Sequence, residues 1–384
     1  MYLLLDGRCS GINANRSGTQ TMIFRFLRVL IAFACLTLAP TLVRAQQKSG
    51  TNFRVGMAFR SYTPKEPYNW RGAKTHALRT TIWYPAVDSA VEQPLQIPGL
   101  NIFVLGNVAQ KADIAAAPPK FPLILMSHGT GGTALSLAWL GTALAAHGYI
   151  VAGVNHPGNN AAEPYTVEGF STWWERARDL SAVIDALLKD STFGTRIDAT
   201  RIGAAGFSLG GYTMIAGGIT DPAAFTDFCA SPKADGICKS PPEFPTLVED
   251  FQKLVKERPE FLRHATDSYH DPRVRAVFAM APALGPAFRL ASLAKITIPV
   301  EIVAGEGDTN VPISSSARYL AANIPGSKLV IYPGAVGHYV FLDSCTEIGQ
   351  KNASILCNDG AGVNRDVIHA QTTDSALQFF EHAL

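Results

Sequence analysis

Three residues whose types suit acyl-transfer chemistry occur along the chain in the order Ser208, Asp308 and His338. A serine hydroxyl is a poor nucleophile until a base takes its proton, and an imidazole can take that proton and later return it to the leaving group. A carboxylate bound to the imidazole fixes its tautomer and stabilises its charged form. The three residues therefore predict a nucleophile, an orienting acid and a base, if the fold brings them together.

Ser208 lies in the segment Gly206-Phe-Ser-Leu-Gly210, between a β-prone run and an Ala/Gly-rich run. This pattern is typical of a nucleophile elbow, a strand-to-helix turn in which the serine is strained and small neighbours prevent collisions. Because G-x-S-x-G also occurs by chance, its weight comes from the predicted strand before it (residues 201–205) and the predicted helix after it. An ordinary capping serine in a glycine-rich turn is the alternative.

Asp308 competes with Glu306 and Asp343 for the role of the acid. Asp308 is preferred because it lies in a glycine turn directly after a predicted strand (residues 298–304), whereas Asp343 lies beyond the histidine and breaks the chain order. His338 also follows a predicted strand. A surface histidine without a catalytic part is its alternative interpretation.

Two backbone amides are candidates for binding the negative charge that develops on a substrate oxygen. Leu209 follows the serine at a helix N-terminus, where the amides and the helix dipole favour negative charge. The second donor is assigned to Thr130 in the loop His128-Gly-Thr-Gly-Gly132, with Gly129 as the alternative. A glycine turn without a catalytic part would also fit this loop. His128 itself is interpreted as a residue that organises the loop.

The elements around these residues predict an α/β fold with a mostly parallel central sheet and helices on both faces. Two antiparallel strands (residues 53–59 and 78–84) open the sheet, and later strands alternate with helices. Each candidate residue follows a strand, so the candidates meet at the carboxyl edge of the sheet, where such sheets bind ligands. His156 also follows a strand, and is interpreted as a structural turn histidine rather than a pocket residue. The remaining predicted strands are residues 121–127, 149–155, 274–280 and 328–332.

One segment, residues 221–271, breaks the alternation of strands and helices after the nucleophile helix. An insertion at that place can cover the strand ends, so a lid is one interpretation and a surface excursion is the other. With 384 residues, 47% hydrophobic and 17% charged, the chain can bury a large core. Residues 46–384 are therefore predicted to form one α/β domain.

The first 45 residues have the pattern of a secretory signal peptide. A short basic region (residues 22–28) precedes an apolar stretch and a small-residue cleavage site that ends at Ala45. Met22 could be the true start, and an uncleaved anchor or lipidation at Cys35 are alternatives. Cleavage predicts a periplasmic or secreted protein without a membrane span.

The mature chain would hold 28 basic and 30 acidic residues without a Lys/Arg-rich run, which argues against nucleic acid as a partner. No spacing typical of a metal site occurs, and no cofactor is predicted. Four cysteines remain after cleavage, which suggests disulfides in an exported protein, although free thiols in a cytosolic protein are the alternative. Closeness in sequence favours Cys229 with Cys238 and Cys345 with Cys357.

Four motifs together resemble those of the α/β-hydrolase superfamily. Within it, the chain looks like the exported bacterial group described as dienelactone-hydrolase-like or platelet-activating-factor-acetylhydrolase-like, from about Phe53 to the end. The motifs are Gly206-Phe-Ser-Leu-Gly-Gly, Ser127-His-Gly-Thr-Gly-Gly, Gly305-Glu-Gly-Asp308 and Gly334-Ala-Val-Gly-His338-Tyr-Val-Phe.

This resemblance implies a serine carboxylic-ester hydrolase that forms an acyl-enzyme on a small-molecule or lipid-like ester. Two departures weaken the finer assignment. Dienelactone hydrolases proper carry cysteine at the position of Ser208, and the acetylhydrolases of animal plasma take their acid from the strand that here ends in Ala279-Met-Ala-Pro. Acyl transfer, or thioester or amide hydrolysis, on the same residues is an alternative, as is a hydrolase-fold binding protein without activity. Nothing in the sequence predicts an oligomeric state.

Overall fold

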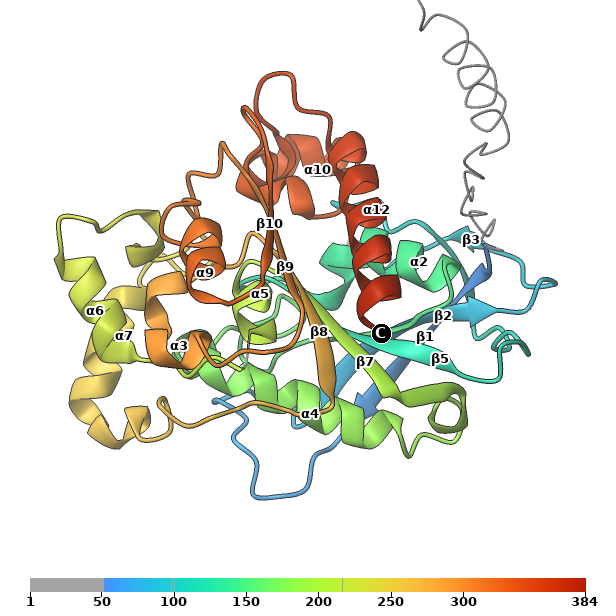
Figure 1. The fold of residues 1–384 in the computed structure, drawn as a ribbon, viewed down its shortest axis with the longest axis horizontal. Coiled ribbons are helices and arrows are strands. Elements are labelled where there is room, and N and C mark those ends of the chain that lie inside the picture. Colours follow the sequence, from blue (N-terminus) through green and yellow to red (C-terminus); the bar gives the residue numbers. More distant parts are fainter. Residues whose placement is uncertain (1–51, 98, 100, 216) are drawn as a thin grey trace, which may run out of the picture. The chain divides into compact units, whose positions relative to one another are not determined.

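A ten-stranded sheet with the order β10-β9-β8-β7-β5-β6-β2-β1-β4-β3 forms the centre of the computed structural model (Figure 1). The structure describes residues 52–97, 99, 101–215 and 217–384, so the predicted signal peptide lies outside the described residues. The strands are β1 Arg54–Tyr62, β2 Leu78–Ala86, β3 Gln93–Pro94, β4 Asn107–Gln110, β5 Phe121–Ser127, β6 Ile150–Val154, β7 Ile197–Phe207, β8 Val274–Met280, β9 Val300–Gly305 and β10 Lys328–Tyr332.

Strands β5 to β10 pair with one another in parallel, whereas β2 pairs antiparallel with both β1 and β6. This arrangement confirms the predicted α/β class and the antiparallel opening. The helices are α2 Ala138–Ala146, α3 Val167–Ser171, α4 Arg176–Leu187, α5 Leu209–Met214, α6 Pro222–Ala230, α7 Leu247–Glu257, α8 Leu290–Leu293, α9 Ala317–Asn323, α10 Glu347–Asn352, α11 Ser354–Cys357 and α12 Arg365–Ala383. The 3-10 turns are η1 Ala134–Leu137, η2 Trp173–Glu175, η3 Gly194–Arg196, η4 Gly236–Cys238, η5 Pro259–Leu262, η6 Gly285–Ala287 and η7 His338–Phe341.

The apolar run of β5 explains why the sheet is covered on both faces. Leu123 and Leu125 point into the cluster that α4 and α5 cover, while Ile124 and Met126 point into the cluster that α2 and α12 cover. Successive side chains of a strand alternate between its faces, so a continuous apolar run requires helices on both sides. Figure 1 shows α12 and α2 on one side of the sheet and α4 on the other.

Two predicted elements differ from the structure in their limits. The nucleophile strand is longer than predicted, since β7 begins at Ile197. Of the helices predicted to alternate with the strands, the one after the glycine loop is divided into η1 and α2. Near its start the pairing of β7 with β5 is irregular, and the residues there are of mixed polarity. The sequence therefore lacks the apolar run that would mark this part as a strand. The elements themselves exist where they were predicted.

Both predicted disulfides, Cys229–Cys238 and Cys345–Cys357, are present. The first closes a loop in the segment 221–271, which contains α6, η4, α7 and η5. The second joins the segment after η7 to α11. The first thus links α6 to η4, and the second encloses α10, so each holds short helical segments together outside the sheet.

Candidate active site

The segment around Ser208 forms a sharp turn between β7 and α5. Ser208 has φ 56° and ψ −119°, a positive φ that is uncommon for a residue other than glycine. A Cβ atom on Gly206 would lie 2.4 Å from the Gly210 carbonyl oxygen, and one on Gly210 would lie 2.0 Å from the Ser127 carbonyl oxygen. Glycine is therefore required on both sides of the serine, and the turn has the geometry of a nucleophile elbow.

The structure brings the three candidate residues of the predicted triad into contact. His338 Nε2 lies 2.9 Å from Ser208 Oγ, and His338 Nδ1 lies 2.6 Å from Asp308 Oδ2. When Nδ1 donates its hydrogen to the carboxylate, Nε2 is left to accept the serine proton. All three residues are buried, at 5–7% exposure, so their hydrogen bonds form in a site largely screened from water.

The position of Asp308 explains how its carboxylate is held. It follows β9, and its second oxygen Oδ1 accepts hydrogen bonds from the Asn310 and Val311 N–H groups, at 3.0 and 2.8 Å. The two competing acids lie elsewhere. Glu306 accepts from the Gly334 N–H, and Asp343 accepts from two N–H groups at the start of α2. Among the three acids, only Asp308 touches the imidazole of the candidate triad.

The glycine loop after β5 lies against the elbow, as expected of a second oxyanion donor. A Cβ atom on Gly129 would lie 3.3 Å from Ser208 Cβ. Within the described residues, the N–H groups of Leu209, Thr130 and Gly129 have no hydrogen-bond acceptor in the protein. Amides without a partner beside a nucleophile are available to a developing oxyanion. The choice of Thr130 over Gly129 stays a prediction.

The His128 ring holds the loop through hydrogen bonds to the backbone and does not act as a proton carrier. Its Nδ1 donates to the Gly129 carbonyl at 2.7 Å, and its Nε2 accepts from the His156 N–H at 3.2 Å. Burial lowers the pKa of the His128 ring well below its usual value, which keeps the ring neutral. Both ring nitrogens are occupied by the backbone, in agreement with the interpretation of His128 as a loop-organising residue.

The segment 221–271 contacts two of the loops that carry candidate residues. A Cβ atom on Gly236, inside the Cys229–Cys238 loop, would lie 3.0 Å from the Asn310 carbonyl oxygen, in the loop that follows Asp308. A Cβ atom on Gly131 would lie 3.1 Å from Cγ of Glu243. The segment therefore reaches the acid loop with one part and the glycine loop with another, and whether it acts as a lid stays a prediction.

Aromatic side chains attach the segment 221–271 to the body of the fold. Phe244 packs against Phe170 of α3 with ring centroids 5.2 Å apart, and Phe225 packs against Trp173 at 5.9 Å. Trp173 thus contacts the segment 221–271 as well as the core cluster on that face of the sheet. The sequence did not predict this contact, because two adjacent tryptophans carry no pattern that tells which neighbour each ring faces.

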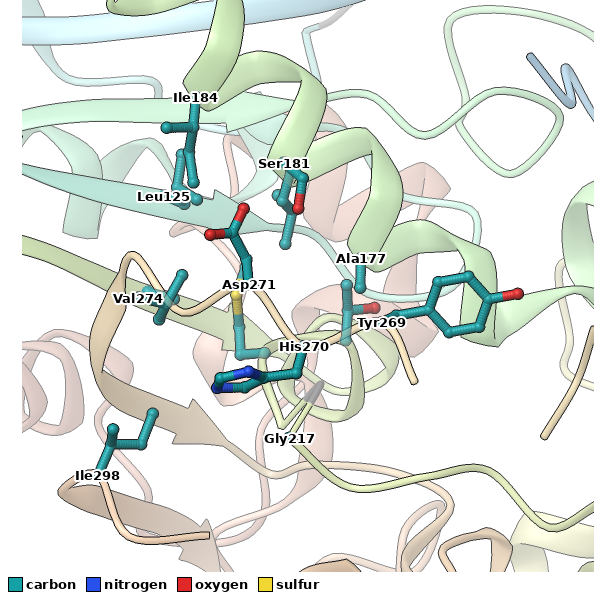
Figure 2. Close-up of a pocket in the computed structure, with 14 residues that line it drawn as sticks. Leu125, Ala177, Ser181, Ile184, Gly217, Tyr269, His270, Asp271, Val274 and Ile298 are labelled. Carbon is teal, nitrogen blue, oxygen red and sulfur yellow. The ribbon is translucent and has the colours of Figure 1, made fainter. Parts of the chain in front are cut away.

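A small cavity lies away from the candidate site, between α4 and the start of β8 (Figure 2). Its volume is about 30 Å³, which is room for a water molecule but not for an ester substrate. The residues that line it do not include Ser208, Asp308 or His338. The labelled lining residues in Figure 2 are Leu125, Ala177, Ser181, Ile184, Gly217, Tyr269, His270, Asp271, Val274 and Ile298.

The described residues hold no group of three or more His, Cys, Asp or Glu side chains placed to bind a metal ion. Among those same residues there is also no helix of the length and apolarity needed to cross a bilayer.

One family model matches a large part of the chain. A model described as "Alpha/beta hydrolase family" matches residues 124–348, which is more than half of the sequence. The chain belongs to the alpha/beta hydrolase family. The matched region contains Ser208, Asp308 and His338, and the narrower resemblance to dienelactone-hydrolase-like or acetylhydrolase-like proteins stays a prediction.

Curated relatives of this alpha/beta hydrolase are similar over a short region. Cutinase est1 of Thermobifida alba is 37% identical over 90 residues, 23% of this chain and 27% of that protein. Cutinase cut1 of Thermobifida fusca is 33% identical over 90 residues, 23% of this chain and 25% of that protein. The chain thus spans about a quarter of the length of the curated relatives it matches.

A solved structure is similar over most of the fold. It is a ferulic acid esterase from Streptomyces cinnamoneus, with a TM-score of 0.58 and 21% identity, covering 88% of this chain and 91% of the other. At this identity the likeness shows the fold alone, in agreement with the predicted α/β-hydrolase architecture.

Proposed function

We propose that the protein is an exported serine carboxylic-ester hydrolase. The observation that carries this proposal is the chain of hydrogen bonds from Asp308 through His338 to Ser208, at 2.6 and 2.9 Å, with the serine in a nucleophile elbow. Such an arrangement gives a hydroxyl a base and gives the base a fixed tautomer. The matching relatives are called cutinases, and the similar fold belongs to a ferulic acid esterase, which agrees with ester hydrolysis.

The reaction would proceed in two halves. Ser208 Oγ attacks the ester carbonyl carbon while His338 Nε2 takes its proton and passes it to the departing alcohol. Water, deprotonated by the same imidazole, then releases the acid from the acyl-enzyme and restores the serine. The N–H groups of Leu209 and Thr130 would hold the oxyanion in both halves, each being worth about 10²–10³ in rate.

The substrate is proposed as a small-molecule or lipid-like ester, without a cofactor and without nucleic acid as a partner. Serine at position 208 disfavours the lactone chemistry that dienelactone hydrolases proper perform with cysteine. Export is supported by the two disulfides together with the signal-peptide pattern that ends at Ala45. Thioester or amide hydrolysis, acyl transfer to an alcohol, and binding without turnover are the other candidates.

A fluorophosphonate probe and a series of p-nitrophenyl esters graded by acyl length test the proposal. The wild-type protein should be labelled at Ser208 and should hydrolyse at least part of the series. Ser208→Ala should lose both properties, with a fall in kcat of at least about 10⁴ and an unchanged melting temperature. Ester turnover retained in this variant, or a wild-type protein that neither labels nor turns over, would contradict the proposal.

Thioester and amide analogues of the preferred ester, measured beside it, separate the remaining candidates. Faster turnover of the ester supports the proposed class, and faster turnover of either analogue replaces it. A wild-type protein that is not labelled at Ser208 and turns over none of the three supports the binding protein.

A further inference from the structure

A second Ser–His–Asp arrangement lies behind the glycine loop, formed by Ser127, His156 and Asp179. Ser127 Oγ is 2.8 Å from His156 Nε2, and His156 Nδ1 is 2.7 Å from Asp179 Oδ2. These distances are close to those in the candidate triad. All three residues are fully buried, so no substrate can reach this serine.

The partners of Ser127 also argue against a nucleophile. Its hydroxyl donates to His156 and accepts from Arg176 Nη2 at 3.2 Å, so the oxygen is occupied by a cation on one side. Arg176 Nη2 also donates to the His128 carbonyl at 2.5 Å. The other two guanidinium nitrogens of Arg176 have no hydrogen-bond partner among the described residues, so its hydrogen bonds are directed at β5 and the loop that follows it.

The same network is connected to the loop at a second point. The His156 N–H donates to His128 Nε2, and His128 Nδ1 donates to the Gly129 carbonyl. Arg176 therefore fixes the His128 carbonyl while His156 fixes the His128 ring. These contacts leave little freedom in Gly129, the one residue that separates His128 from the proposed oxyanion donor, Thr130.

The elbow rests on the same segment from the other side. A Cβ atom on Gly210 would lie 2.0 Å from the Ser127 carbonyl oxygen and 2.8 Å from the His128 carbonyl oxygen. The start of α5, which provides the Leu209 N–H, is thus in close contact with the backbone that carries the Thr130 N–H. A displacement of residues 127–128 would change the separation of the two proposed donors.

From these contacts we propose that Ser127, His156 and Arg176 are positioning residues that set the geometry of the oxyanion hole. Asp179 holds His156 through Nδ1 and is itself bound by Arg71 Nη2 at 2.6 Å. All four side chains are fully buried and would act through the backbone of the loop. The inference rests on the proposed ester hydrolysis and on the Thr130 loop as one of the two oxyanion donors.

Ser127→Ala tests this inference, because it removes one oxygen and two hydrogen bonds without adding volume. Its matched control is Ser292→Ala. Ser292 is also a buried serine with two hydrogen bonds, from the Ile219 N–H and to the Arg289 carbonyl, but it belongs to α8. The two variants should lose similar amounts of melting temperature. Only Ser127→Ala should lower kcat, by about tenfold to a hundredfold with little change in KM.

Inhibition by a trifluoromethyl ketone separates an effect on the oxyanion hole from a general loss of structure. Its adduct with Ser208 places an oxyanion in the hole, whereas the matching methyl ketone binds as a ground-state analogue. In Ser127→Ala the inhibition constant of the trifluoromethyl ketone should rise by the same factor as kcat falls, while that of the methyl ketone stays constant. Equal weakening of both ketones, or unchanged kcat and affinities, would overturn the inference.

Tyr68→Phe keeps the inference testable if Ser127→Ala does not fold. The Tyr68 hydroxyl donates to Asp179, so this variant loosens the network at its far end without touching the loop. A fall in kcat of about two- to fivefold, with the same selective loss of trifluoromethyl ketone affinity, is expected. No change in Tyr68→Phe would then decide against the inference. If the wild-type protein itself lacks ester turnover and fluorophosphonate labelling, the proposed function fails instead.

Discussion

The chain contains two Ser–His–Asp arrangements with nearly equal distances and opposite surroundings. In the first, Ser208 Oγ lies 2.9 Å from His338 Nε2. In the second, Ser127 Oγ lies 2.8 Å from His156 Nε2. The first serine stands at positive φ beside amides without a partner, whereas the second is the last residue of β5 and accepts from an arginine.

The comparison teaches that the hydrogen-bonded order of three side chains does not by itself make a nucleophile. A reactive serine needs a lone pair directed at space that a substrate can enter, and donors for the charge that forms there. The hydroxyl oxygen of Ser127 accepts a hydrogen bond from Arg176 and is buried away from solvent. The same hydrogen-bond pattern can therefore serve chemistry in one place and loop geometry in another.

Replacement of the acid in the candidate triad should have the largest effect on activity. Asp308→Asn should lower kcat by about 10⁴, because the amide favours the wrong tautomer of His338 and cannot stabilise its charged form. The melting temperature should change little, and the enzyme assay with the preferred ester measures the loss. Glu306→Gln, two residues earlier in an exposed position, is the control and should stay within about twofold of wild type. A mild effect of Asp308→Asn would break the distinction between the two arrangements.

The corresponding change in the second arrangement should act on stability first. Asp179 is fully buried and binds both His156 and Arg71, so Asp179→Asn leaves buried positive charge without its partner. A loss of about 3–5 kcal/mol in the free energy of unfolding is expected, measured by denaturant titration. Asp185→Asn on the same helix removes an exposed ion pair with Arg273 and should cost less than about 1 kcal/mol. Equal stability losses in the two variants would show that the Asp179 network contributes no more than a surface ion pair.

The two arrangements also differ in how far the sequence predicted them. Ser208, Asp308 and His338 could be found because each sits in a glycine-containing turn after an apolar run, and because their order along the chain is typical of the fold. The sheet could be predicted for the same reason, since continuous apolar runs alternate with helical patterns.

The second arrangement was missed because its members have no local pattern. Ser127 ends an apolar strand, and Asp179 is one polar residue in a helix of mixed composition. Their contact depends on how α4 is rotated about its own axis where it packs on the sheet. The hydrophobic pattern of the helix does not fix this rotation closely enough to say which polar side chain faces Ser127. The place of Glu243 beside Gly131 depends on the path of an irregular segment and was unreadable for a similar reason.

Titration of His156 sharpens the comparison at the level of single protons. Burial and the nearby Arg176 lower the pKa of His156 from about 6.5 to about 3, although Asp179 opposes this shift. The folded protein therefore binds fewer protons than the unfolded chain between these values. The stability that His156 contributes is complete above pH 6.5 and is lost as the pH falls toward 3.

Nitrogen-detected NMR of the His156 ring, assigned by its absence in His156→Gln, measures this directly. One ring nitrogen should carry hydrogen and the other should not, with constant shifts from pH 8 to pH 5. A neutral ring is required because Nε2 must accept the Ser127 proton, and a protonated ring would turn that acceptor into a donor. Half-protonation above pH 5 would show that the buried arrangement holds an ordinary titrating histidine. The two Ser–His–Asp arrangements would then differ only in the solvent exposure of their serines.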